Sequence, residues 1–374
     1  MNAWLFQDHR QKQKLGDEAP WSVGWIDPDS KRRSKRIGAK SAAEKYRRKI
    51  EGQLAAGVYR HDARKTWAEF RKEYTARIVD PMPASSQKCV KTALQNFEVA
   101  VKPVKLSAIK TQTVDAFIAE RRKATGRKGQ PLSPATINRD LRHLKAAFRV
   151  AHEWGYLPAV PKVRMVREQE KLPRFVTDEH FEAIYKACKT AKYPAGLPYS
   201  AADWWRGLLT FAYMTGWRIS ECLSLRRADA DLDAATAITR AADNKGGRDA
   251  IVPLSPVVVQ HLRRLTSFHP VMFPWHYHER TLWAEFSRIQ KAAGIKLPCE
   301  VEHEHTDACH HYGFHDLRRA FATQNAPALS ADALQKLMRH KSYLTTQRYI
   351  NMAGQLDAAV DVLHVPEVLK SKKA

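Results

Sequence analysis

The segment LMRHKSYLTTQRYIN, residues 337–351, combines one histidine and two tyrosines with basic and small polar residues and contains no acid. Tyr349 follows His340 by nine positions. A free tyrosine is a poor nucleophile at neutral pH because its pKa is about 10, and neighbouring cations favour the ionised form. The composition of this segment therefore suits a tyrosine that attacks a negatively charged electrophile.

Three further segments carry groups that a phosphodiester requires. Attack on phosphorus builds negative charge on the non-bridging oxygens, and forked guanidinium groups match those oxygens in charge and geometry. Arg218 follows an apolar segment at a glycine turn, and Arg318 stands three residues after His315, so that this pair shares a helix face. Lys245 lies in the turn NKGGR, within reach of a leaving oxygen. Each residue alone has a structural reading as a surface charge, a salt bridge or a turn residue, but their order favours a catalytic set.

These four segments together resemble the motifs of the tyrosine recombinases, the phage-type integrase family, and the resemblance extends from about residue 177 to residue 359. TGWRISECLSLRRADAD resembles the first motif, NKGGRDAIVPL the β-hairpin, FHDLRRAFAT the H-x-x-R motif and LMRHKSYLTTQRYIN the final motif. The resemblance implies that the catalytic residues are Arg218, Lys245, His315, Arg318, His340 and the nucleophile Tyr349.

The chemistry that the resemblance implies is strand cleavage through a 3′-phosphotyrosyl link. Tyr349 would attack the scissile phosphate while the arginines and histidines hold the phosphoryl oxygens. Lys245 would protonate the departing 5′ oxygen as general acid. A 5′ hydroxyl from a second DNA strand would then reverse the step, so neither ATP nor a catalytic metal or other cofactor is implied.

Three further residues lie within the matching motifs but outside the catalytic set. Arg339 stands directly before His340, where a glycine is usual in the family, and it adds charge near the site. Glu221, three residues after Arg218, is expected to orient a basic neighbour. Tyr343 does not fit the family spacing, and we expect it to be a packing residue.

The charge balance independently indicates a polyanionic partner. The 374 residues include 63 Lys and Arg against 39 Asp and Glu, which gives a net charge of +24. Such a surplus favours nucleic acid. Apolar runs long enough for a membrane span are absent, and the N-terminus lacks the apolar core of a signal peptide. Five scattered cysteines do not form a disulfide framework. We therefore expect a cytoplasmic, nucleoid-associated protein.

The predicted fold class is mainly α with small β elements (α+β). We expect an arm-type DNA-binding domain at 1–60, a helical core-binding domain at 61–160, a linker at 161–176 and the catalytic domain at 177–359. Residues 360–374 form an apolar tail that is expected to dock on a neighbouring protomer. Inside the catalytic domain, the sequence predicts helices beginning after Thr177 and over 204–216, and a hairpin with strands at 235–240 and 249–254.

Basic residues outside the catalytic domain are candidates for DNA contact. A hairpin is predicted from Trp21 onward, followed by a helix with Ser41 as its N-cap and Glu44 at the capping-box position. A second helix begins after Ser133 with Pro134 at its first position. The predicted DNA-binding residues are Lys31, Arg32, Arg33, Lys35 and Arg36 in the hairpin and Arg139, Arg142 and Lys145 on the second helix. The alternative for the hairpin is a solvated charge run.

A cysteine- and histidine-rich segment, PCEVEHEHTDACHHYGFHD, precedes the H-x-x-R motif. Sulfur and imidazole ligands at short intervals suit tetrahedral zinc, although the spacing is not that of a standard finger. The sequence predicts a structural zinc site with Cys299, His303, His305 and Cys309 as ligands. The alternative is a polar, histidine-rich loop near DNA.

The expected partners are double-stranded DNA attachment sites of a mobile element, bound by a homotetramer on paired sites, with no membrane partner. Two alternative functions share parts of this pattern. A type IB topoisomerase-like enzyme uses the same chemistry, but the basic N-terminal unit and the helical middle region favour an integrase. A DNA-binding relative that has lost catalysis would not be expected to keep all six chemical residues.

Overall fold

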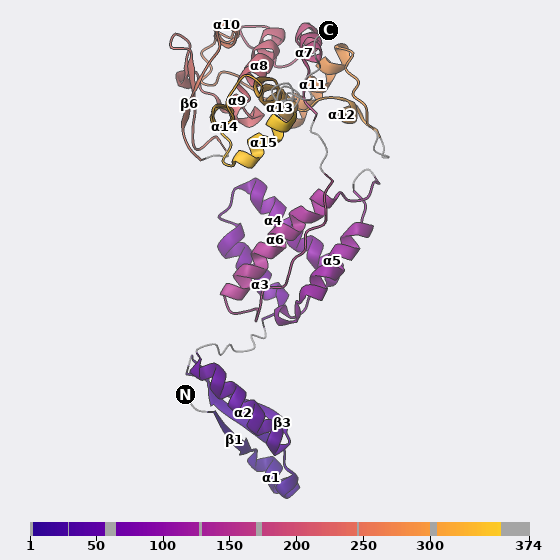
Figure 1. Ribbon diagram of the computed structural model, residues 1–374, viewed down its shortest axis with the longest axis vertical. Helices are drawn as coiled ribbons and strands as arrows, with labels where there is room; N and C mark the ends of the chain where they lie inside the picture. Colours follow the sequence, from indigo (N-terminus) through magenta and orange to yellow (C-terminus); the bar gives the residue numbers. More distant parts are fainter. Residues whose placement is uncertain are drawn as a thin grey trace, which may run out of the picture. The chain divides into compact units, whose positions relative to one another are not determined.

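The computed structural model describes residues 3–28, 30–56, 65–126, 129–169, 174–244, 247–299 and 305–352. The chain divides into two compact units, residues 1–169 and 170–374. Helices dominate both, and each contains one small three-stranded sheet, as the predicted mainly α class requires (Figure 1). Within the described ranges, no helix is long and apolar enough to cross a membrane.

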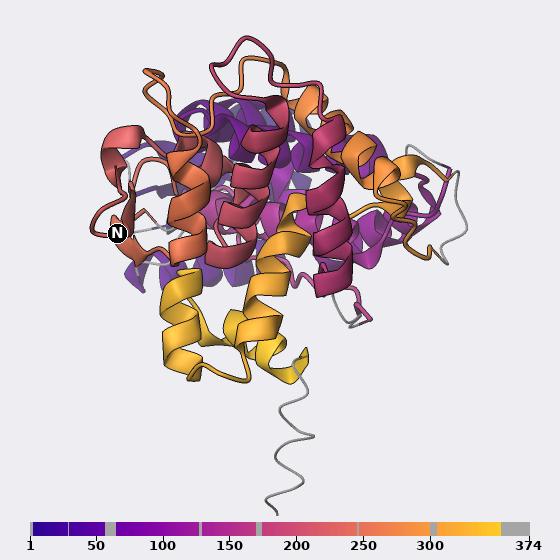
Figure 2. The ribbon, with the colours of Figure 1, turned by 90° about the horizontal axis from the view of Figure 1, so that it is seen from above.

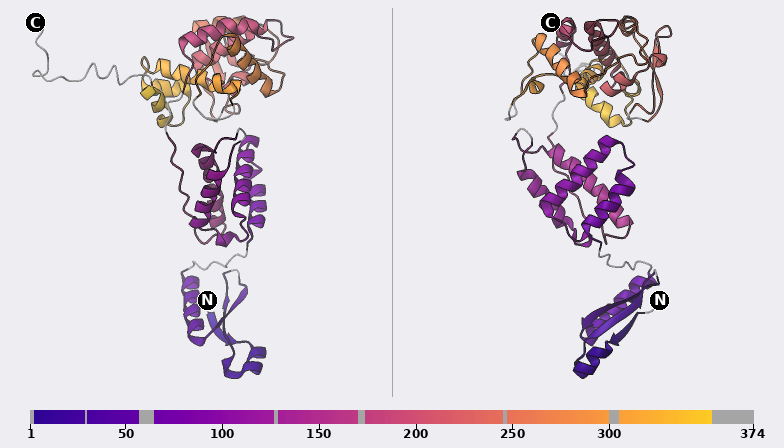
Figure 3. Two further views of the ribbon diagram at one scale, coloured as in Figure 1. Left: turned by 90° about the vertical axis from the view of Figure 1, so that its right-hand side faces the viewer. Right: turned by 180° about the vertical axis from the view of Figure 1, so that it is seen from behind.

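The N-terminal part of the first unit is a three-stranded antiparallel sheet with one long helix packed on it (Figure 3). Its elements are β1 (Ala3–Gln7), α1 (His9–Leu15), β2 (Trp21–Ile26), β3 (Arg32–Gly38) and α2 (Lys40–Ala55). Ala3, Val23 and Trp25 form a small core with apolar residues of α2. The predicted hairpin is confirmed as β2 and β3, whereas β1 and α1 were not predicted.

The predicted N-cap of α2 is wrong. The helix begins at Lys40 with Ala39 in the cap position, and no side chain caps it. Ser41 lies inside the first turn instead. The sheet determines this start, because β3 ends at Gly38, whose φ of 111° turns the chain directly into the helix.

The remainder of the first unit is a helical bundle. It contains α3 (Trp67–Tyr74), the π-helical turn η2 (Thr75–Val79), α4 (Ala84–Val101), α5 (Thr111–Lys123) and α6 (Pro134–Glu153). The α6 prediction is confirmed in detail, because Ser133 Oγ accepts a hydrogen bond from the Thr136 amide at 3.2 Å and Pro134 occupies the first turn. One face of α6 is an apolar stripe that is buried, formed by Ile137, Leu141, Leu144, Phe148 and Ala151.

An extended segment after α6 lies along this bundle. The buried Asn138 side chain donates to the carbonyl of Val166 at 2.8 Å and accepts from its amide at 2.7 Å. The Lys162 amide donates to Thr111 Oγ1 at 3.1 Å. The first half of the segment that the sequence assigns to a linker is therefore bonded into the first unit, which extends to residue 169. The predicted boundary at residue 60 lies outside the described residues.

The second unit surrounds a nearly all-apolar helix, α8. Its helices are α7 (Asp178–Ala187), α8 (Ala201–Thr215), α9 (Ile219–Ser224), α10 (Pro256–Arg263), α11 (Glu279–Ala292), α12 (Asp307–His310), α13 (Phe314–Asn325), α14 (Ala331–Met338) and α15 (Tyr343–Met352). The Trp204, Trp205, Leu208 and Phe211 side chains of α8 are fully buried. Thr177 caps α7 as predicted, and its Oγ1 accepts from the His180 amide at 3.3 Å.

The small sheet of this unit has the order β4 (Ala230–Asp231), β5 (Thr236–Thr239) and β6 (Ala250–Pro253). The predicted hairpin is confirmed, with Thr239 paired to Ala250 at the end next to the turn. In Figure 2 the C-terminal helices α14 and α15, drawn in yellow, lie side by side at one edge of the unit. The 3₁₀ turns are η1 (Gly16–Glu18), η3 (Leu106–Ala108), η4 (Cys188–Thr190) and η5 (Arg227–Asp229).

Candidate active site

Arg218 lies at the junction between α8 and α9. α8 ends at Thr215 and is capped by Gly216, whose φ of 63° is a left-handed conformation that suits glycine. A Cβ at Gly216 would lie 2.6 Å from Phe321 Cδ1 and 2.9 Å from Met338 Sδ, so the position is also too crowded for a side chain. This tight turn brings the chain from α8 to Arg218, which is the N-cap residue of α9.

Glu221 holds two guanidinium groups, as its predicted orienting role requires. Arg218 Nη1 donates to Glu221 Oε1 at 2.7 Å, and Arg339 Nη2 donates to Oε2 at 2.5 Å. Burial alone would raise the pKa of Glu221, but the charge of Arg339 and the hydrogen bonds from Arg218 outweigh it, so this pKa lies below its usual value. Glu221 is therefore an anion between two cations.

Arg339 makes more contacts within the protein than its sequence position indicates. It ends α14 in a left-handed conformation with φ of 52°, which explains why a glycine suits this position. Its guanidinium lies over the ring of Trp217, with Cζ 4.8 Å from the ring centroid. Together with the pair to Glu221, this contact fixes the chain directly before His340.

Arg318 is almost completely buried, at 1% exposed. Its guanidinium donates to the carbonyl of Gly216 at the end of α8 and to the carbonyl of Met338 at the end of α14. Burial lowers its pKa to about 9, with further contributions from Arg218 and Arg339, so it remains a cation at neutral pH. Two of its five N–H groups are used in these bonds.

His315 and His340 lie near the same cations. Desolvation by the surrounding protein and the charges of Arg319 and Arg318 lower the pKa of His315. Burial and the charges of Arg318 and Arg218 lower the pKa of His340 to about 4, so that His340 is neutral at pH 7 in the DNA-free protein. In the DNA-free protein, both imidazoles are therefore neutral groups that can form hydrogen bonds.

Tyr349 stacks on His340. The ring centroids are 5.8 Å apart with an interplanar angle of 17°. The hydroxyl of Thr346, which is fully buried, lies 3.0 Å from His340 Nδ1 and orients the imidazole. Tyr349 is 7% exposed, whereas Tyr343 at the start of α15 is 48% exposed. The expectation that Tyr343 is a packing residue is wrong, because the helix begins there and directs it away from the core.

Lys245 lies outside the described residues, but the hairpin that leads to it is described. Asn244 Nδ2 donates to the carbonyl of Arg240 at 2.6 Å and to that of Arg248 at 2.8 Å. The Ala241 amide donates to Asp249 Oδ1 at 2.6 Å. These bonds hold together the described residues on either side of Lys245.

Sequence reasoning missed the structural roles of Arg339 and Thr346. Thr346 is three residues before Tyr349 on α15, and this spacing places both on one helix face, which is a signal that the sequence does contain. The pair between Arg339 and Glu221 joins residues 118 positions apart, and nothing local to either residue predicts it.

The predicted arm-domain residues divide between the two faces of the sheet. Arg33 and Lys35 pair with the β2 residues that face α2, and the Arg33 guanidinium lies 2.8 Å from the buried Asp27 carboxylate. Lys35 lies over the ring of Tyr46 on α2, at 4.8 Å. These two residues thus have structural partners on the helix-covered face.

Lys31, Arg32 and Arg36 are exposed. Arg32 and Arg36 lie on the sheet face opposite α2, where the Arg32 guanidinium is 5.2 Å from the centroid of the Trp4 ring. In the bundle, Arg139 and Arg142 are exposed on α6, whereas the third predicted residue, Lys145, is half-buried.

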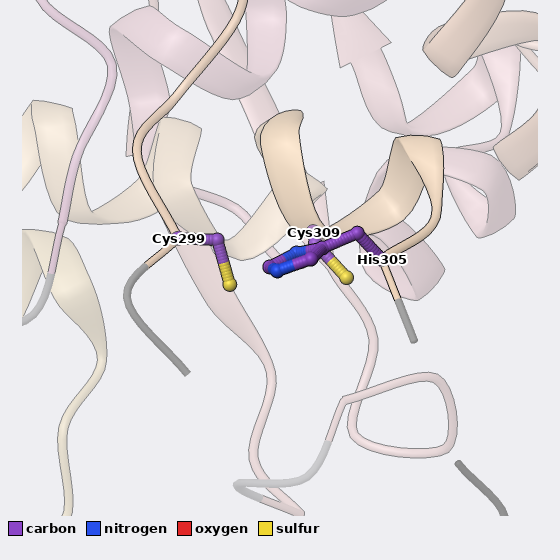
Figure 4. A group of neighbouring side chains, drawn as sticks. All are labelled: Cys299, His305 and Cys309. Atoms are coloured by element: carbon purple, nitrogen blue, oxygen red, sulfur yellow. The ribbon is translucent and has the colours of Figure 1, made fainter. Parts of the chain in front are cut away.

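Cys299, His305 and Cys309 lie together near α12, with their ligand atoms within 4.8 Å of one another (Figure 4). His303, the fourth predicted ligand, lies outside the described residues. His310 and His311 of the same segment have different surroundings, because His310 Nδ1 lies 2.7 Å from the Leu297 carbonyl and His311 Nδ1 lies 2.6 Å from Ser287 Oγ.

The arrangement of a buried tyrosine, a histidine stacked on it and two arginines held by helix ends defines the catalytic domain of a tyrosine recombinase. Residues 174–355 match the phage integrase family. The second unit of this chain belongs to that family.

Similar proteins agree with this assignment. A putative integrase/recombinase y4qK of Sinorhizobium fredii is 24% identical over 65% of this chain and 70% of its own length. The tyrosine recombinase XerC of Chlorobaculum parvum is 28% identical over 50% of this chain and 59% of its own. A lambda integrase dimer bound to a COC′ core site has a chain of the same fold, with a TM-score of 0.59 and 16% identity over 94% of this chain and 95% of that one. The protein is thus a site-specific recombinase, and a topoisomerase function is not favoured.

Proposed function

We propose that this protein cleaves and rejoins DNA strands at attachment sites through a 3′-phosphotyrosyl intermediate on Tyr349. The observation that carries the proposal is the stacking of Tyr349 on His340 beside a cluster of guanidinium groups. The positive charge of that cluster would attract a phosphate to the nucleophile.

In the first step, the Tyr349 hydroxyl loses its proton to water as its oxygen attacks the scissile phosphorus and the bond to the 5′ oxygen breaks. Arg218 and Arg318 bind the non-bridging oxygens as charge builds there, and His315 and His340 donate hydrogen bonds to them. Lys245 gives its proton to the departing 5′ oxygen. In the second step, a 5′ hydroxyl of another strand attacks the phosphotyrosine, and Tyr349 leaves with its oxygen.

The two basic regions of the first unit would supply most of the affinity. Arg32 and Arg36 on the open sheet face support an arm-type contact with a DNA groove, and Arg139 and Arg142 on α6 support contact with core-site phosphates. Structures of lambda integrase include a tetramer bound to a Holliday junction. We propose the same assembly here on paired attachment sites, with the tail at 360–374, which lies outside the described residues, docking on a neighbouring protomer. Such a protein would act on the nucleoid in the cytoplasm.

The test is covalent capture on a nicked DNA duplex that carries the attachment sequence, taken from repeats that flank the gene. Tyr349→Phe keeps the ring and its stacking on His340, so fold and DNA affinity should persist while the covalent adduct disappears. Tyr343→Phe is the matched control, since Tyr343 is an exposed tyrosine on the same helix. An adduct that peptide mapping assigns to Tyr343, or that persists in Tyr349→Phe, would overturn the assignment.

Arg218→Ala should behave differently from loss of the nucleophile. It leaves Tyr349 in place but removes one charge from the transition state, and the loss of one such group typically slows a reaction about 10²–10³-fold. Slow adduct formation is therefore expected in single-turnover measurements. A rate equal to that of the unmodified protein would exclude Arg218 from phosphate binding.

A further inference from the structure

We propose that Cys299, His305 and Cys309 bind one zinc ion that fixes the loop leading into α13. The two sulfurs and the imidazole converge in Figure 4, with all ligand atoms within 4.8 Å of one another. Tetrahedral zinc with ordinary Zn–S and Zn–N bonds separates its ligand atoms by about 3.6–3.8 Å. Side-chain rotations that move these atoms by about 1 Å would complete the three contacts.

The donor set indicates which metal would bind. Two thiolates and one imidazole are soft and borderline ligands, which favour zinc over magnesium or calcium. Two thiolates also balance the charge of a divalent ion, so the complex adds no net charge to this half-buried loop. The Thr306 hydroxyl, 3.6 Å from Cys309 Sγ, can donate to the thiolate and orient it.

Hydrogen bonds close the base of this loop. The Leu297 amide donates to the His310 carbonyl at 2.8 Å, and His310 Nδ1 lies 2.7 Å from the Leu297 carbonyl. These bonds join the two ends of the segment that carries the three ligands. A metal inside it would therefore add a cross-link between Cys299 and Cys309 near an already ordered junction.

The far end of this loop leads directly to the catalytic helix α13. The Arg174 guanidinium donates to the Cys309 carbonyl at 3.3 Å and to the His311 carbonyl at 3.0 Å. The same guanidinium lies 3.7 Å from the Asp316 carboxylate, in the first turn of the helix that carries Arg318. Zinc would thus stabilise the loop at the start of α13 without contributing to the phosphoryl chemistry.

The test is the metal content of the full chain, purified from zinc-supplemented cells with any affinity tag removed and measured by mass spectrometry. We expect about one zinc per chain in the unmodified protein. Cys309→Ser and His305→Ala should each lose most of it, and the melting temperature should fall by several degrees. Cys89→Ser in α4 is the matched control, because Cys89 is a half-buried cysteine of the first unit and should leave the zinc content unchanged.

His305→Ala keeps the test decisive if a cysteine variant fails to fold, because the His305 side chain is exposed. Cobalt provides a second readout, since thiolate-to-cobalt charge transfer should appear in the unmodified protein and weaken in both variants. Three results would each overturn the proposal: a zinc-free unmodified protein, variants that retain their zinc, or a Cys299–Cys309 disulfide in freshly purified protein.

Discussion

The bridge formed by Glu221 between Arg218 and Arg339 predicts a specific pattern of coupled stability losses. Arg339→Met removes the guanidinium but keeps an unbranched side chain in the same left-handed backbone conformation. Breaking a buried ion pair typically costs about 3–5 kcal/mol. Glu221 would keep its bonds to Arg218, at 2.7 Å from Nη1 and 3.1 Å from the amide, so we expect a smaller loss of about 1–3 kcal/mol.

Glu221→Gln should be more costly than Arg339→Met. The amide is neutral, so Arg339, with 12% of its side chain exposed, would remain a buried cation without its anion. We expect the full loss of about 3–5 kcal/mol. In the double variant neither charge is present, and the combined loss should be smaller than the sum of the single losses by about 1–3 kcal/mol.

The assay is unfolding by heat and by urea of four full-length proteins: the unmodified protein, the two single variants and the double variant. The transition to follow is the one that shifts in the Glu221 variants. Single-turnover DNA cleavage adds a functional readout. Cleavage should fall more in Glu221→Gln than in Arg339→Met, because only Glu221 contacts Arg218. If the two stability losses add to within about 0.5 kcal/mol, the residues are independent and the reasoning is refuted.

Three further predictions concern pH, packing and DNA affinity. The pKa of His340 is lowered from 6.5 to about 4, so between these values the unfolded state binds a proton that the folded state excludes. The free energy of unfolding should therefore be highest above pH 6.5 and fall by about 1–3 kcal/mol as the pH drops to 4. Urea titrations of His340→Gln should show a smaller fall. Gly216→Ala should destabilise the protein by about 3 kcal/mol or more, because the new Cβ would overpack against Phe321. Gly294 has the same left-handed backbone and nothing within 4 Å of an added Cβ, so Gly294→Ala should destabilise the protein by only about 1 kcal/mol. Calorimetry measures both losses. Deleting residues 1–60 should reduce the slope of the logarithm of the DNA-binding constant against the logarithm of the salt concentration by about 0.9 for each lost phosphate contact. Cleavage of a core site should remain intact. Unchanged DNA affinity at every site would contradict an arm domain.

Local signals explain which parts of the fold the sequence predicted. α6 has a serine cap, a proline in its first turn and an apolar stripe, and all three act within one helix. β1 has no such signal, because its five residues become a strand only through pairing with β2. The start of α2 was missed for the same reason, since the preceding strand and not a cap residue determines where the helix begins.

The site shows the same division between motif and geometry. The spacing in the sequence predicts that His315 lies near Arg318 and His340 near Tyr349. His315 and Arg318 lie on one helix, α13, and His340 lies in the short turn before α15, the helix that carries Tyr349. The bond between Arg339 and Glu221 depends on how α9 and α14 approach one another. A sequence pattern does not encode that approach.

The carbonyl contacts of Arg318 bear on how degraded relatives of this enzyme should be read. A guanidinium that ties the ends of α8 and α14 together is under selection for folding even when recombination is no longer required. A decaying copy that survives as a DNA-binding protein should therefore keep Arg318 long after Tyr349 has drifted. Retention of Arg318 in such a copy would therefore not by itself indicate an active recombinase.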